Sequence, residues 1–116
     1  MSNRFYLLLA PLVLAGCAND PAPVEQMRLT DQAIEQAQAV GAADEDPNLA
    51  LARDKAAQAR AAVAAQQFKQ ARLAAEQAEL DARLAEAQEL NRKSAASLAQ
   101  TNAKLVRLRK QLGDEQ

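Results

Sequence analysis

The sequence predicts an all-α fold, in which an antiparallel helical hairpin carries a short N-terminal helix and a long, extended C-terminal helix. Two observations predict this class. Alanine and leucine recur at spacings of three and four along most of the chain, which is the period of a helix with one apolar face. Between residues 48 and 112 there is neither glycine nor proline, and strong helix formers dominate.

Residues 1–16 have the organisation of a cleaved export signal. Arg4 and the amino terminus supply positive charge, and an apolar run from Phe5 to Leu14 follows. This run is too short to cross a bilayer core, for which a helix needs about 20 apolar residues. We therefore expect the mature protein to lack residues 1–16.

The end of this signal, Leu14-Ala15-Gly16-Cys17, resembles the lipobox of bacterial lipoproteins. The resemblance implies that diacylglycerol is attached to the Cys17 sulfur and that the chain is then cut before Cys17. Leu14, Ala15 and Gly16 would serve this processing, because the peptidase accepts only small side chains just before the cut. The alternative is an ordinary export signal with an unrelated cysteine beside it.

Residues 17–23 then comprise the acylated cysteine and a tether, in which Pro21 and Pro23 favour extended backbone. Two or more acyl chains hold a protein durably on a membrane. In the sorting rule of enteric lipoproteins, an aspartate directly after the cysteine retains the protein in the inner membrane. Because Ala18 stands there instead, the resemblance implies an outer membrane anchor that faces the periplasm.

The composition argues against catalytic and metal-binding chemistry. The sequence has no histidine and no tryptophan, and its one cysteine is Cys17. A mature chain with Cys17 acylated has no histidine acid–base pair, no disulfide and no cysteine metal ligand. The 14 basic and 15 acidic side chains are nearly balanced, which does not favour nucleic acid as a partner. We expect no enzyme activity, no catalytic residue, no metal and no cofactor beyond the covalent lipid.

The helical domain is predicted to occupy residues 24–112, and its first helix residues 24–40. Ile34 and Ala37 recur there at helical spacing, and Gly41 is suited to end the helix. The acidic run Asp44-Glu45-Asp46 follows. A cation site is one interpretation of this run, but it lacks the spacing and the glycine turn of a calcium loop, so we favour a solvated loop.

Asp46 and Pro47 predict the start of a second helix over residues 47–65, since aspartate caps a helix and proline fits its first position. The apolar face of this helix comprises Leu49, Ala52, Ala56, Ala59 and Val63. Gln66-Gln67 offers a turn, although neither residue enforces one. The alternative is a single unbroken helix from residue 47 to residue 112.

Residues 68–112 are predicted to form a third helix about 68 Å long, and residues 113–116 a tail. Such a length exceeds a compact domain of this size, so part of the helix must be exposed or covered by another chain. One face is a stripe of small residues, Ala71, Ala75, Ala78, Ala82 and Ala85, which lets the second helix approach closely. A second face carries Leu73, Leu80, Leu84, Leu98, Leu105, Leu108 and Leu112.

This second face follows a heptad pattern that polar residues interrupt, so it suits a partner-dependent coiled coil better than an autonomous one. Asn91 lies in the pattern, either to fix its register or simply on a solvated surface. The distal part is also basic, from dipole compensation near the helix end or from a binding function. The predicted partner surface is Leu98, Leu105, Leu108, Arg92, Lys93, Lys104, Arg107, Arg109 and Lys110.

Two segments carry a family resemblance. Residues 46–55 read DPNLALARDK, and residues 67–82 read QFKQARLAAEQAELDA. Together they resemble the small envelope lipoproteins that contain domain of unknown function 4398. The resemblance covers about residues 24–90 and implies no catalytic residue. This domain also occurs fused to OmpA-like peptidoglycan-binding domains, which implies an envelope role. Gln66-Gln67 departs from the Gly-Asp that is usual in the family at this turn.

These features predict a membrane-anchored periplasmic lipoprotein that acts as a non-catalytic helical scaffold or adaptor. Its expected contacts are membrane lipid through the anchor, an envelope protein or peptidoglycan, and a second copy of itself. The alternative is a peptidoglycan-associated structural lipoprotein that contributes to envelope integrity. Covalent attachment through a C-terminal lysine, as in the major murein lipoprotein, is not expected because the sequence ends in Gln116.

Overall fold

The computed structural model describes residues 20–114 and confirms the all-α class. Its three helices are α1 (Val24–Ala39), α2 (Pro47–Ala64) and α3 (Phe68–Asp114). α1 and α2 each end one residue before the expected boundary, and α3 runs two residues beyond it. Gly113 keeps a helical conformation, since one glycine weakens a helix by only about 1 kcal/mol relative to alanine.

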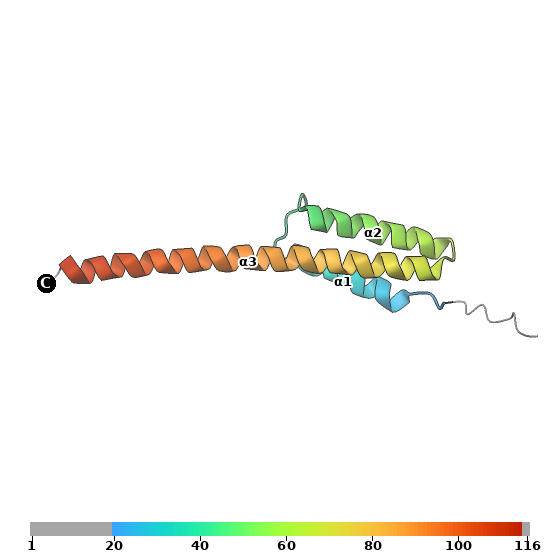
Figure 1. Cartoon of the computed structure of the whole chain (residues 1–116), viewed down its shortest axis with the longest axis horizontal. Helices are drawn as coiled ribbons and strands as arrows, with labels where there is room; N and C mark the ends of the chain where they lie inside the picture. Colours follow the sequence, from blue (N-terminus) through green and yellow to red (C-terminus); the bar gives the residue numbers. More distant parts are fainter. Residues whose placement is uncertain (1–19, 115–116) are drawn as a thin grey trace, which may run out of the picture.

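α3 is the central element of the structure, and the other two helices pack against its first half (Figure 1). α2 runs antiparallel to α3, whereas α1 runs parallel to it. We call residues 24–90 the head and residues 91–114 the arm. Every described side chain of the arm is exposed, and the arm extends the helix by about 36 Å beyond the head.

The loop between α1 and α2 is fixed by a helix end and a helix start. Gly41 has a φ of 93°, and the Gly41 and Ala42 amides donate to the carbonyls of Gln38 and Ala37. The Asp46 carboxylate accepts from the amides of Asn48 and Leu49 at 2.9 and 3.0 Å, and Pro47 follows it as expected. Gly41 therefore ends α1 and Asp46-Pro47 begins α2, as the sequence predicts.

A turn at Gln66 separates α2 from α3, so the alternative of one unbroken helix over residues 47–112 is wrong. Gln66 has a φ of 58°. Its amide donates to the Val63 carbonyl, and the Gln67 amide donates to the Ala62 carbonyl. This is the same hydrogen-bond pattern that Gly41 forms after α1, here with a glutamine in the left-handed region.

The core consists almost entirely of alanine. We call its buried residues the alanine seam: Ala33, Ala37, Ala52, Ala56, Ala59, Ala62, Ala71, Ala75, Ala78, Ala82 and Ala85. Leu49 is the one larger apolar side chain that is buried with them, against Ala37 and Ala85. Ala62 replaces the expected Val63 on this face, because Val63 is only half-buried. Alanine buries little area, so the seam stabilises mainly by letting backbones approach closely.

Thr30 is a buried polar residue that the sequence pattern did not single out. It is fully buried, and its hydroxyl lies 2.9 Å from the Gln26 carbonyl and 2.8 Å from the Ala75 carbonyl. The second contact joins α1 to α3. A small side chain with one donor fits here, because its hydroxyl finds an acceptor in either helix.

Ion pairs and amide contacts connect the helices around the seam. Lys55 of α2 binds Asp81 of α3 at 2.6 Å, and both side chains are largely buried. Arg60 of α2 binds Asp31 of α1. The exposed Arg60–Asp31 pair contributes little to stability, so we assign it mainly to the orientation of α1 and α2.

Substitution Ala78→Leu tests the seam. Ala78 is fully buried, so a larger side chain must overpack the contact between helices, and we expect a loss of about 1–3 kcal/mol in the free energy of unfolding. Urea denaturation measures this loss. Ala99→Leu is the matched control, because Ala99 lies in the exposed arm of the same helix. Equal stability of both variants would contradict the seam.

Substitution Gln66→Gly tests the turn. Glycine adopts a positive φ without steric cost, so we expect the free energy of unfolding to rise by about 1 kcal/mol. Gln67→Gly, one position later, is the control and should not stabilise the protein. Thermal and urea unfolding of the two variants give the comparison. A destabilised Gln66→Gly variant would rule out the left-handed turn.

Candidate functional site

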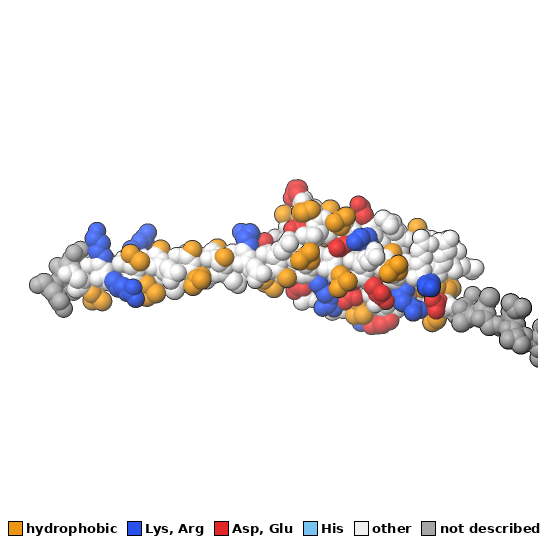
Figure 2. Space-filling view, viewed as in Figure 1, with side chains coloured by type: hydrophobic (Ala, Val, Ile, Leu, Met, Phe, Trp, Pro, Cys, Tyr) orange, Lys and Arg blue, Asp and Glu red, His pale blue; other side chains and the backbone are white. Residues whose placement is uncertain are grey.

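The most prominent surface feature is a line of leucines along α3. We call Leu73, Leu80, Leu84, Leu98, Leu105, Leu108 and Leu112 the leucine stripe. Their side chains are 46–66% exposed, although leucine is among the residues most often buried. Apolar side chains recur along the whole length of α3 on the face that Figure 2 presents. Within the head, α3 therefore buries five alanines, Ala71, Ala75, Ala78, Ala82 and Ala85, and turns its leucines toward solvent.

The stripe follows the expected heptad pattern, and all of its positions are open. Positions a are 77, 84, 91, 98, 105 and 112, and positions d are 73, 80, 87, 94, 101 and 108. Each of these side chains is exposed, including that of Asn91. The alanine seam uses other positions of the helix. A second helix can thus reach the stripe without displacing α1 or α2.

Two of the expected partner-surface residues, Arg92 and Lys93, have partners within the head. Arg92 donates to both carboxylate oxygens of Glu89 at 2.6 and 2.8 Å. Lys93 donates to the Val40 carbonyl at the end of α1 and lies 3.8 Å from Glu89. Arg92 thus forms the close pair with Glu89, and Lys93 caps the C-terminal end of α1. These contacts attach the start of the arm to the head.

The other four basic residues of the surface, Lys104, Arg107, Arg109 and Lys110, are exposed along the arm. Within residues 20–113, no acidic side chain forms an ion pair with any of them. The head has 12 acidic and 7 basic side chains, whereas residues 91–112 have 6 basic ones and none that are acidic. With Asp114 included, the chain is strongly polarised in charge, from −5 in the head to +5 in the arm.

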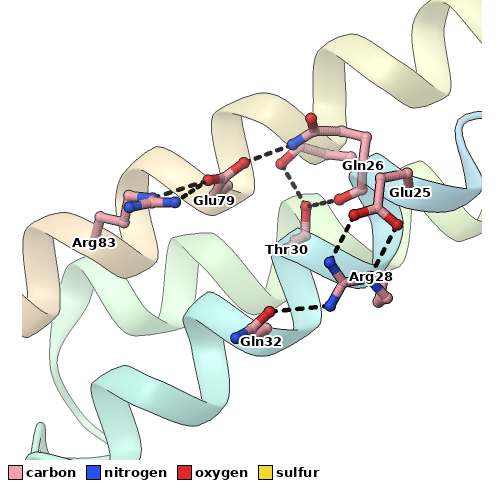
Figure 3. A network of polar contacts seen from close by, with 8 residues as sticks. Glu25, Gln26, Arg28, Thr30, Gln32, Glu79 and Arg83 are labelled. Carbon is pink, nitrogen blue, oxygen red and sulfur yellow. Dashed lines mark hydrogen bonds and ion pairs between the residues drawn. The ribbon is translucent and has the colours of Figure 1, made fainter.

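A polar network connects α1 to α3 beside the seam (Figure 3). The Gln26 amide donates to Glu79 at 2.7 Å, and Arg83 donates to the other carboxylate oxygen at 2.6 and 2.8 Å. These hydrogen bonds, first that of Gln26 and then that of Arg83, hold the pKa of Glu79 below its usual value. Glu79 is thereby kept as a charged acceptor between the helices.

The tether and the arm lie at opposite ends of the molecule (Figure 1). Asp20 and the first turns of α3 border an open groove of about 770 Å³, next to the turn at Gln66. The proposed lipidation residue Cys17 and the processing residues Leu14, Ala15 and Gly16 lie outside the described residues. The described tether residues nevertheless fix the end of the head from which the preceding chain departs.

The acidic loop serves the fold. Asp46 caps α2, and Asp44 binds Arg53 at 2.6 Å, so these carboxylates serve different contacts. Among residues 20–114, no group of three potential ligands is placed to hold a metal ion. None of the helices in this part of the chain is apolar and long enough to cross a membrane.

The family model of DUF4398, a domain of unknown function, matches residues 25–112. The chain belongs to this family. A crystal structure of a DUF4398 family protein from Pseudomonas aeruginosa PAO1 is similar to it, with 58% sequence identity and a TM-score of 0.79. The match covers 83% of this chain and 100% of the crystallised one. No match was found among curated proteins.

Membership of the DUF4398 family confirms the resemblance in the sequence and extends it. The sequence resemblance reached residue 90, whereas the family model continues to residue 112 and so includes most of the arm. The arm is therefore part of the family's domain. Neither the family description nor the similar crystal structure assigns a reaction, a ligand or a partner.

Substitution Gln26→Met tests the network around Glu79. It removes the amide donor, so we expect the pKa of Glu79 to rise and the stability at neutral pH to fall by about 1 kcal/mol. The pKa of Glu79 in the folded protein lies below its usual value, so this stabilisation is present above the usual glutamate pKa and is lost as the pH falls through the lowered one.

The difference between wild type and Gln26→Met should therefore shrink at acidic pH, as the pH falls through the lowered pKa of Glu79 and its carboxylate becomes protonated. Urea unfolding at neutral and at acidic pH and NMR titration of Glu79 measure it. Gln36→Met is the control, because Gln36 is exposed on the same helix. A difference that does not depend on pH would contradict the role of the Glu79 charge.

Proposed function

We propose that this protein is a membrane-anchored periplasmic lipoprotein that acts as a non-catalytic helical scaffold or adaptor in the cell envelope, at the outer membrane. The anchor is the lipid on Cys17, and the working surface is the leucine stripe with the basic residues of the arm. The observation that carries the proposal is the placement of the tether and the arm at opposite ends of the molecule (Figure 1).

The shape of the protein supports a scaffold. α3 continues without a break from the head to the end of the arm, so a contact on the arm is held at a set distance from the anchored end. An exposed stripe of large apolar side chains of this extent is typical of a surface that binds another protein. The alanine seam offers no enclosed cavity in which a substrate is held away from water.

Peptidoglycan association is a second candidate, which the charge of the arm favours. Lys104, Arg107, Arg109 and Lys110 present positive charge at the end of the molecule that lies farthest from the tether. Peptidoglycan carries carboxylates, so such an arm is attracted to it at low ionic strength. We favour the scaffold because binding to polar peptidoglycan would leave the apolar leucine stripe without a function.

Substitution Cys17→Ser tests the anchor. Serine has no thiol to acylate, so we expect the precursor to remain uncleaved or the protein to leave the membrane fraction. Membrane flotation and mass spectrometry of the amino terminus measure both effects. Ala10→Ser, within the apolar run, is the control and should leave processing unchanged. A Cys17→Ser protein that is still processed and membrane-bound would contradict lipidation.

Two further measurements separate the finer parts of the proposal. In an enteric host, Ala18→Asp should move the protein from the outer to the inner membrane, and a wild type already in the inner membrane would contradict the proposed location. Co-sedimentation with purified peptidoglycan should give little binding at physiological salt. Binding that is lost when Lys104, Arg107, Arg109 and Lys110 are replaced by glutamine would favour the wall-associated function.

A further inference from the structure

We propose that the leucine stripe is covered by α3 of a second copy of this chain, packed antiparallel to form a two-stranded coiled coil along the head and the arm. This inference deepens the scaffold proposal, since it names the partner of the same surface. It does not depend on the lipid anchor. The order of the leucines, the charges beside them and the open face of α3 each support it.

In one antiparallel register, four of the seven leucines of the stripe pair with one another across the contact. In an antiparallel coiled coil, an a position of one helix faces a d position of the other. In this register, Leu105 faces the partner's Leu80, and Leu112 faces the partner's Leu73. Asn91 then meets the partner's Ser94 at the centre, whereas Leu84, Leu98 and Leu108 face the partner's Thr101, Ala87 and Gln77. The apolar layers lie toward both ends of the contact.

The charges beside the stripe favour this direction over the parallel one. In a parallel pair, a g position faces the e position five residues later on the other helix. Glu76 would then face the partner's Asp81, and Lys104 would face the partner's Arg109. Both contacts join like charges, and each occurs twice in a symmetric dimer. A parallel dimer is therefore penalised along both the head and the arm.

The antiparallel pair replaces these repulsions with attractions. Lys104 comes close to the partner's Glu76, and Arg109 comes close to the partner's Asp81. Asp81 already binds Lys55, so we assign the larger effect to the exposed Glu76. On the larger scale, the arm of one copy, with a net charge of +5, lies along the head of the other, with a net charge of −5.

The head leaves room for this partner. The a and d positions of α3 are exposed along the head as well as along the arm, and α1 and α2 occupy other faces of the helix. Figure 2 shows apolar side chains both on the head and on the arm of the same view. The contact extends from residue 73 to residue 112, or about 60 Å of paired helix.

Sedimentation equilibrium of the chain from residue 18 onward tests the oligomeric state. The crystallised relative corresponds to only 83% of this chain, so we expect this part to fold by itself. We expect a dimer at micromolar concentration. Leu105→Ala should weaken it at least tenfold without loss of helix in circular dichroism. Val106→Ala is the matched control, because Val106 is exposed beside Leu105 but off the stripe.

The direction of the two helices is tested by a charge change and a distance. Lys104→Glu should weaken an antiparallel dimer about tenfold, because the new carboxylate meets Glu76, and should strengthen a parallel one. The double variant Lys104→Glu with Glu76→Lys should restore the antiparallel dimer, because it exchanges the two opposite charges. A spin label at Ala103→Cys should lie more than 30 Å from its counterpart when the helices are antiparallel, and under about 20 Å when they are parallel.

A monomer at all concentrations would overturn the proposal, as would a Leu105→Ala variant that dimerises like wild type. A dimer that Lys104→Glu strengthens, or one with the short label distance, would overturn the antiparallel arrangement. Because these measurements use the chain without lipid, a negative result would not affect the proposed lipid anchor. Conversely, a Cys17→Ser result that contradicts lipidation would not affect the proposal of a dimer.

Discussion

The structure depends on close contact between helices through alanine. A seam of alanines brings α1, α2 and α3 together at short range, and a single leucine, Leu49, provides the bulk at its end. Because alanine buries little apolar area, the head relies on backbone proximity, helix propensity and polar contacts around the seam. The same constraint explains why α3 turns its leucines outward, since they are too large for a seam of this width.

This arrangement reverses the usual relation between size and burial, and it gives the protein two separate apolar faces. One face builds the monomer, and the other remains available for a partner. The long helix α3 is held at its middle by Lys93, which donates to the Val40 carbonyl at the end of α1, and strong helix formers continue it into the arm. Because the head is acidic and the arm is basic, the charges beside the exposed face favour a partner helix that runs antiparallel to α3.

Much of this architecture could be predicted from the sequence, and the failures have identifiable causes. Asp46, Pro47 and Gly41 marked helix boundaries because their preferences are local. Gln66 was ambiguous because a left-handed glutamine carries no strong local signal, and only the packing of α2 on α3 selects it. Thr30 was missed because a polar side chain interrupts the apolar period, although burial in a helix contact suits its size and hydroxyl.

The sequence by itself determined the helices, the alanine and leucine periods on α3, and the basic character of the arm, since each depends on neighbours within a few turns. It also contains the Cys17 motif, which lies before the helical domain and on which the proposed lipid anchor rests. Only the tertiary structure decided that α1 lies parallel to α3, that Lys93 and Arg92 serve the head, and that the tether and the arm point in opposite directions. These features depend on contacts between residues as far apart as Val40 and Lys93, and such contacts exist only once the helices have packed.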